Sequence, residues 1–121
     1  MKTILVVDDS DVRLKLRDEF CKLGFNVITA INIQEAKIGF SEGEIDLVII
    51  DDSIKNFNIL TILEDVNKYS KNIPIILCLS DCYENSVKNL LSQPYLKDVS
   101  FINKKDNIYE IKDKVKEILD V

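Results

Sequence analysis

The chain has 121 residues and a formal net charge of −5, from 21 acidic and 16 basic residues. The length fits one compact domain over residues 1–121, and the hydrophobic fraction of 46% is that of a globular protein rather than a disordered one. The longest basic run near the end, Lys104-Lys105, is too short to neutralise a nucleic-acid backbone, so no direct nucleic-acid binding is expected. The lack of histidine excludes Ser-His and Cys-His catalysis within the chain.

Short apolar runs alternate with amphipathic stretches along the chain. Five runs predict strands at 4–7, 27–30, 47–50, 75–79 and 99–102. Three of them are continuous and β-branched, which is typical of strands covered on both faces in a parallel sheet.

The stretches between these runs predict helices. The first places Val12, Leu16, Phe20 and Leu23 on one stripe and is expected to end at Gly24 as a C-cap. The later stripes are Ala36 and Phe40, in a helix that opens at Asn32 with Glu35 at capping-box spacing; Ile59, Ile62, Leu63 and Val66, in a helix that begins near Asn58; Val87, Leu90 and Leu91; and Ile108, Ile111, Val115, Ile118 and Leu119.

Five β-α units in succession predict an α/β fold with right-handed crossovers. The expected architecture is a doubly wound five-stranded parallel sheet with helices on both faces. In such a sheet, ligands bind beyond the carboxyl ends of the strands. The residues that follow the strands are Asp8 and Asp9, Asp51 and Asp52, Ser80 and Asp81, and Asn103 with Lys104 and Lys105.

These residue types together suit one kind of chemistry. Clustered carboxylates repel one another unless a hard cation lies among them, and Mg²⁺ prefers oxygen ligands. A carboxylate beside the ion can attack phosphorus, while a lysine and a hydroxyl stabilise the transferred phosphoryl group. Taken singly, Ser10, Asp52 or Asp81 is better explained as a turn former or helix N-cap.

The segments that carry these residues resemble response-regulator receiver domains of two-component signalling, nearly from end to end. The resemblance implies the flavodoxin-like strand order 2-1-3-4-5. The matching segments are 4–10, 46–51, 73–77 and 101–104, with Arg13, Leu16, Phe20, Gly24, Phe25, Val27 and Glu35-Ala36 at the family's spacing.

The resemblance also implies roles for individual residues. Asp51 would be the phosphorylation site and also a Mg²⁺ ligand, Asp9 a direct Mg²⁺ ligand and Asp8 a ligand through a metal-bound water. The backbone carbonyl of Ser53 would complete the coordination, and Lys104 would pair with Asp51 or its phosphate. The chain would then be a signalling module that catalyses at most its own phosphoryl transfer and dephosphorylation.

Two further residues would report the event by the same resemblance. Phe101 matches the aromatic that changes rotamer on activation, although it also fits an ordinary aromatic at a sheet edge. Counting from Pro74 places the switch hydroxyl at Leu79, so either a β-bulge brings Ser80 into place or the hydroxyl is absent; we favour Ser80.

The sequence departs from the family around these positions. The segment after Asp51 lacks the usual Met-Pro and Gly, and Lys105 replaces a proline, so a trans peptide is expected there. These departures leave open a degenerate receiver that acts as a phosphorylation-independent interaction module. A flavodoxin-like cofactor enzyme is a third reading, but the acidic loop from Asp8 to Asp11 would repel a phosphate that lacks a metal.

The expected partners follow from the resemblance. A histidine kinase or phosphotransfer protein would supply phosphate, and an output domain or partner protein would bind the face formed by the fourth helix, fifth strand and fifth helix. A homodimer on activation stays open, as does whether the chain stands alone or belongs to a longer regulator.

Cysteine usage bears on the compartment. Cys21, Cys78 and Cys82 form an odd set without a secretory leader, which indicates reduced thiols in the cytoplasm, and Cys21 and Cys78 are expected to be buried. No apolar run approaches the roughly 20 residues that span a bilayer, so no membrane association is expected.

Overall fold

The structure is a computed structural model that describes residues 1–69, 72–80, 98–103 and 108–120. The strands are β1 (Thr3–Val7), β2 (Asn26–Ala30), β3 (Leu47–Asp51), β4 (Ile75–Leu79) and β5 (Val99–Asn103). The helices are α1 (Val12–Lys22), α2 (Ile33–Glu42), α3 (Ile59–Tyr69) and α5 (Ile108–Leu119). The predicted helix around 87–91 lies outside the described residues.

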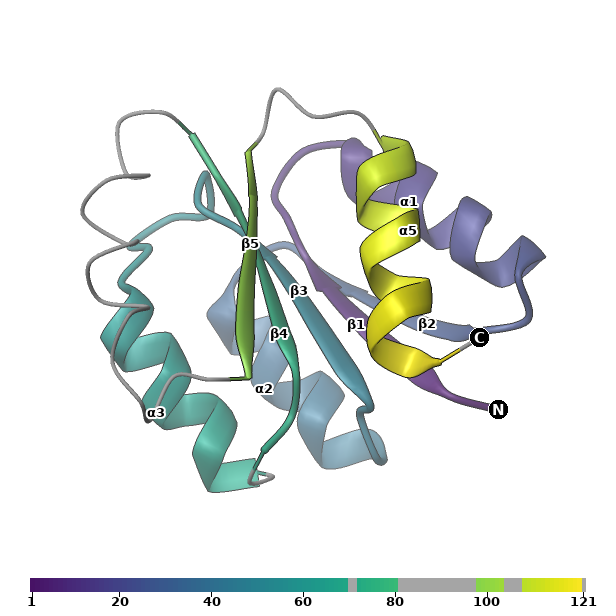
Figure 1. Ribbon diagram of the computed structural model, residues 1–121. Coiled ribbons are helices and arrows are strands. Elements are labelled where there is room, and N and C mark those ends of the chain that lie inside the picture. The colour runs from purple at the N-terminus through teal and green to yellow at the C-terminus, as the bar shows by residue number, and fades with distance from the viewer. Residues whose placement is uncertain (70–71, 81–97, 104–107, 121) are drawn as a thin grey trace.

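The five strands form one parallel sheet in the order β2-β1-β3-β4-β5. Helices α1 and α5 cover one face, and α2 and α3 cover the other (Figure 1). The described residues of β1, β3 and β4 are almost wholly buried, while the edge strands β2 and β5 keep partly exposed positions. The predicted α/β architecture is therefore confirmed, including the strand order.

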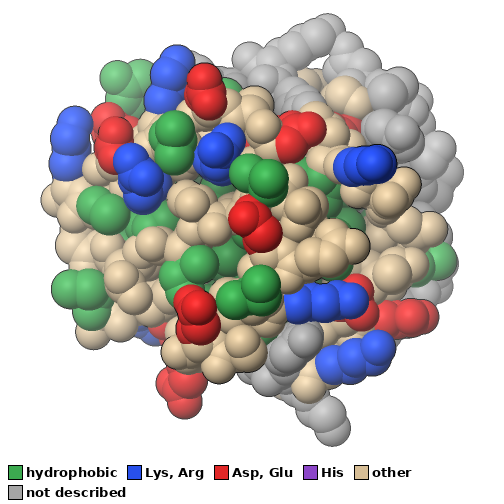
Figure 2. Space-filling view, turned by 180° about the vertical axis from the view of Figure 1, so that it is seen from behind, with side chains coloured by type: hydrophobic (Ala, Val, Ile, Leu, Met, Phe, Trp, Pro, Cys, Tyr) green, Lys and Arg blue, Asp and Glu red, His purple; other side chains and the backbone are tan. Residues whose placement is uncertain are grey.

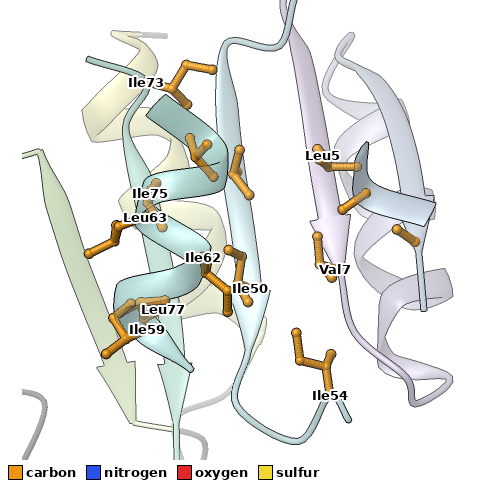
Figure 3. Close-up of a cluster of buried hydrophobic side chains, with 14 of the residues drawn as sticks. Leu5, Val7, Ile50, Ile54, Ile59, Ile62, Leu63, Ile73, Ile75 and Leu77 are labelled. Atoms are coloured by element: carbon orange, nitrogen blue, oxygen red, sulfur yellow. The ribbon is translucent and has the colours of Figure 1, made fainter. Parts of the chain in front are cut away.

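Alternating residues of the central strands feed two hydrophobic layers. The layer under α2 and α3 combines Leu5 and Val7 with Ile50 and the α3 residues Ile59 and Ile62 (Figure 3). The stripe predicted for α3 is buried as expected, and so is the centre of the α5 stripe. Burying a side chain of this size stabilises the fold by roughly 1.5–3 kcal/mol, so the two layers fix where the strand ends lie.

The capping signals in the sequence form as predicted. The side chain of Asn32 accepts a hydrogen bond from the Glu35 N–H at 2.9 Å, and the Glu35 carboxylate accepts one from the Ile31 N–H at 2.8 Å. Gly24 follows α1 with a positive φ of 92°. The turn at Gly24 sets the direction in which the chain enters β2, and the cap at Asn32 sets the direction in which it leaves.

Two expectations about α1 are wrong. Val12 and Leu23 are exposed, whereas Leu16 and Phe20 are buried, because only the middle turns of the helix lie against the sheet. Cys21 is exposed, while Cys78 is buried as expected. One residue is about 100° of helix rotation, so the residue after the buried Phe20 points away from the core.

Ion pairs join the helices on each face of the sheet. The Lys112 ammonium of α5 lies 3.1 Å from the Glu19 carboxylate of α1, and the hydrogen bond and charge of Lys112 lower the pKa of Glu19. Lys37 of α2 lies 3.7 Å from Asp65 of α3. Such partly exposed pairs near the surface stabilise the fold only modestly. The face in Figure 2 shows Lys and Arg side chains interspersed with Asp and Glu.

The helices were compared with the length and hydropathy of a membrane span. Within the described ranges, none is both long enough and apolar enough to cross a bilayer.

Candidate functional site

Acidic residues meet at the carboxyl ends of β1 and β3, the upper edge of the sheet in Figure 1. Val7 pairs with Ile50 in the parallel register, so the residues that follow them, Asp8 and Asp51, leave neighbouring strands at the same level. Asp9 comes directly after Asp8. The sheet therefore brings together the acids that the sequence predicted for one site.

Asp8 is the buried member of this group, with an exposed fraction of 3%. Its Oδ1 accepts hydrogen bonds from the N–H and the O–H of Ser10, both at 2.8 Å. Burial raises the pKa of Asp8; the Ser10 hydrogen bonds oppose this, and the negative charges of Asp51 and Asp9 add to the rise. The carboxylates of Asp51 and Asp9 are thus close enough to act on the charge of Asp8.

Ser53 links the other two acids. Its N–H donates to Asp51 Oδ1 and its O–H donates to Asp9 Oδ1, each at 2.8 Å. The sequence predicted a role only for the carbonyl of Ser53, and that role stays a prediction. The hydroxyl of Ser53 is the contact that joins the end of β1 to the end of β3.

The donor set fits a magnesium ion in kind. It consists of carboxylate oxygens, and a hard divalent cation would favour the charged form of Asp8, whose pKa is raised first by burial and then by the charges of Asp51 and Asp9. Across the described residues, however, no three His, Cys, Asp or Glu side chains already converge as a metal site. Ser53 bonds one oxygen of Asp9 and one of Asp51, and each carboxylate has further lone pairs with which to bind an ion.

A cavity of about 600 Å³ opens beside the acids. Asp8, Asp9, Asp51 and Ser53 line its polar side, together with Asn103 from the end of β5. Its apolar side is formed by Val12, Leu16, Ile49, Cys78, Ile102, Ile108 and Ile111. The site has room for a small anion and its hydration beside Asp51.

Ser80 lies at the end of β4 but contacts a different acid from the predicted one. Its N–H and O–H donate to Asp52 Oδ2 at 2.6 and 2.8 Å. In the described part of the chain, β4 keeps an unbroken register with β3 through Cys78 and with β5 through Leu79, so the bulge that would move Ser80 into the position of Leu79 is absent. Leu79 itself belongs to the core, with an exposed fraction of 1%.

Asp52 is the residue that sequence reasoning missed. Its sequence position suggests a turn former or helix N-cap, but the residue is only 5% exposed and its carboxylate binds Ser80 at the end of the neighbouring strand. Its N–H donates to the Cys78 carbonyl at 3.0 Å and so continues the β3–β4 ladder. The sequence did contain a signal for this contact: Asp52 and Ser80 are polar residues that follow β3 and β4, which are neighbours in the predicted strand order.

The loop after Asp51 turns without the family's glycine and proline. Asn56 adopts a φ of 61°, a left-handed conformation that Asn tolerates better than most residues. Ile54, in the same loop, is buried in the layer under α2 and α3 (Figure 3). The unusual sequence therefore still packs the loop against the core.

The remaining predicted residues lie at the β5 side. Phe101 pairs with Leu77 and is 37% exposed on the edge strand, which agrees with the position expected of it. Lys104 and Lys105, and with them the predicted lysine contact and trans peptide, lie outside the described residues.

Comparison of this chain with known proteins identifies the family to which it belongs. No protein-family model and no curated protein sequence matches the chain. Among solved structures, it is similar to the response regulator protein TrrA from Thermotoga maritima in complex with Mg²⁺-BeF, with 32% identity over 98% of this chain and 99% of that one and a TM-score of 0.73.

Two further structures agree. The receiver domain of the hybrid histidine kinase CckA is 26% identical over 97% of this chain and 98% of that chain, with a TM-score of 0.74. A two-component response regulator from Clostridium difficile, at 23% identity, shares the fold with a TM-score of 0.80 over 98% and 96% of the two chains. The chain is similar to TrrA over nearly its whole length, and it has the same kind of evidence in its strand order and in the acids at its strand ends. The chain therefore belongs to the response-regulator receiver domain family.

Proposed function

We propose that Asp51 accepts a phosphoryl group from a histidine kinase or phosphotransfer protein in a Mg²⁺-dependent reaction. The observation that carries this proposal is the gathering of Asp8, Asp9 and Asp51 at one edge of the sheet, where burial raises the pKa of Asp8 and the charges of Asp51 and Asp9 add to the rise. A site that is unfavourable without a cation supports a function that needs one.

The residues divide the work between holding the ion and accepting phosphate. Asp9, Asp8 through a water, and the Ser53 carbonyl would hold Mg²⁺, which when bound offsets negative charge on the phosphoryl oxygens. A carboxylate oxygen of Asp51 attacks phosphorus, and the bond from phosphorus to the donor atom breaks. Lys104 would then pair with the new phosphate.

The response is proposed to reach a partner protein or output domain through the face of β5, α5 and the predicted fourth helix. A hollow of about 560 Å³ on this side is lined by Phe101 and by Glu110, Asp113, Lys114 and Glu117 of α5. Its exposed aromatic and charged residues suit a protein contact. On this account residues 1–121 form one cytoplasmic receiver domain, which homodimerises on activation if this face is self-complementary.

The experiment uses acetyl phosphate with Mg²⁺ and intact mass spectrometry. The wild-type protein is expected to gain one phosphoryl group, and Asp51→Asn is expected to gain none. Asp11→Asn, which removes an exposed carboxylate near the site, serves as the control that should still be labelled. Unlabelled wild-type protein, or labelled Asp51→Asn, would contradict the proposal.

A degenerate receiver is the second candidate function. It is favoured by the lack, within the described ranges, of three converging metal-ligand side chains and by the contact of Ser80 with Asp52. Mg²⁺ titration followed by NMR distinguishes the two functions. Saturable shifts that Asp9→Ala removes support a working pocket, whereas shifts that persist in Asp9→Ala, or none at all, support the degenerate form.

A further inference from the structure

The carboxylate of Asp52 holds both hydrogen-bond donors of Ser80. One oxygen, Oδ2, accepts from the backbone N–H at 2.6 Å and from the hydroxyl at 2.8 Å. The carboxylate lies in a buried position, and the Asp52 N–H is fixed to the Cys78 carbonyl at 3.0 Å. Hydrogen bonds to an ionised acceptor that water cannot easily reach are the stronger kind.

The register of β4 makes Ser80 the hydroxyl available at this strand end. Cys78 pairs with Asp51, and the next residue, Leu79, is buried and pairs with Asn103. Leu79 has no polar group with which to bind a phosphoryl oxygen. A hydroxyl contact from β4 to a phosphorylated Asp51 would therefore have to come from Ser80, directly after Leu79.

We propose that Asp52 is a positioning residue that stabilises the resting state by competing with the phosphoryl group for the Ser80 hydroxyl. This inference rests on the proposed function. A serine hydroxyl has one hydrogen to donate, so it cannot serve Asp52 and a phosphoryl oxygen fully at the same time. Phosphorylation must draw the hydroxyl away from a buried carboxylate, which opposes the change and makes the switch harder to turn on.

The competition predicts a specific pattern of affinities. Beryllofluoride with Mg²⁺ is the probe, because it occupies the place of a phosphoryl group on an aspartate, and calorimetry measures its binding to the full chain. Asp52→Ala is expected to bind about tenfold more tightly than wild type, the effect of one hydrogen bond no longer having to be broken. Asp52→Asn, which keeps an oxygen acceptor of the same shape, should change affinity in the same direction by less.

The decisive comparison repeats both substitutions in a Ser80→Ala background. If Asp52 acts through the hydroxyl, Asp52→Ala gives no gain once the hydroxyl is gone. Simple charge repulsion between Asp52 and the bound anion would give the same gain in both backgrounds and would overturn the inference.

Separate controls distinguish a variant that does not fold from one that does not bind beryllofluoride. Thermal unfolding of each variant shows whether it is folded, and Asp52→Asn carries the comparison if Asp52→Ala is not. An unchanged affinity in a folded Asp52→Asn also overturns the inference while leaving the proposed function intact. Saturable binding absent from wild type and every folded variant would overturn the proposed function itself, and the inference with it.

Discussion

Asp8 illustrates how a functional residue can oppose the stability of the fold that carries it. Its side chain is buried beside two other acids, and among the described residues two hydrogen bonds from Ser10 compensate for the loss of water. A carboxyl whose pKa is raised by folding favours the protonated form in the folded state, so its charge destabilises the fold at neutral pH.

The first prediction follows from this conflict. Asp8→Asn should raise the free energy of unfolding in the absence of Mg²⁺ by roughly 1 kcal/mol at pH 7, since the amide oxygen can still accept from Ser10 while the charge is gone. The same substitution should weaken Mg²⁺ binding. Urea unfolding and Mg²⁺ titration measure the two effects.

The pH dependence of this difference has a defined sign. The pKa of Asp8 in the folded protein lies above its ordinary value of 3.8, so the wild-type penalty is present at neutral pH and is lost as the pH falls through the raised pKa toward 3.8. The stability advantage of Asp8→Asn should therefore shrink on acidification. Asp11→Asn, an exposed acid nearby, is the matched control and should show no such gain. A gain that stays constant down to pH 4 would contradict the assignment.

For single residues, the sequence predicted which acids cluster better than it predicted which side chains form hydrogen bonds. Clustered acids after two strands were enough to place Asp8, Asp9 and Asp51 in one site, because parallel strand ends must meet. The partner of Ser80 was not predictable, because whether its hydroxyl binds Asp51 or Asp52 depends on side-chain directions that strand alternation alone does not determine. Cys21 was misjudged because its environment depends on helix phase rather than on residue type.

Among the elements, α1 shows how one glycine ends a helix. The N–H of Gly24 donates to the Cys21 carbonyl at 3.0 Å, and the N–H of Phe25 donates to the Phe20 carbonyl at 3.1 Å, which is the Schellman pattern. The rings of Phe20 and Phe25 then meet edge to face, with centroids 6.3 Å apart. This turn directs the chain from α1 into β2 and so places α1 over the sheet.

Two glycines offer a controlled test of that turn. Gly24→Ala should lower the free energy of unfolding by about 1 kcal/mol, because the positive φ of 92° disfavours any side chain even though space is open around the new methyl group. Gly43→Ala is the matched control: its surroundings are equally open, but its φ of 171° is extended, so a change near zero is expected. Equal losses in both variants would mean that the α1 turn is not strained by a side chain.

Elements with strong periodicity were predictable, and their ends less so. The stripes of α3 and α5 appear where predicted because their periodicity is written in the sequence. The caps at Asn32 and Gly24 also appear, since each depends on contacts within a few residues. The predicted burial of Val12 and Leu23 was wrong, because burial at the ends of α1 depends on how far the helix extends along the sheet.

At the scale of the whole molecule, topology carries the functional argument. The order β2-β1-β3-β4-β5 brings the ends of β1 and β3 side by side and sets β4 beside β3, so acids remote in sequence share one edge. No short motif here is strong alone, whereas strand order and similarity to TrrA over nearly the full length identify the family. With this unusual loop after it, β3 ends at Asp51 between β1 and β4, which keeps Asp51 at the shared edge.

The most direct test is to find which atom carries the phosphate. An acyl phosphate on a carboxylate reacts with hydroxylamine, which attacks the acyl carbon, releases phosphate and leaves a stable hydroxamate that peptide mass spectrometry can locate. After acetyl phosphate and Mg²⁺, the hydroxamate should be found at Asp51 alone, and chelation of Mg²⁺ should prevent it. A hydroxamate at Asp8, Asp9 or Asp52, or a phosphate that resists hydroxylamine on Ser53 or Ser80, would contradict the assignment of Asp51 as the acceptor.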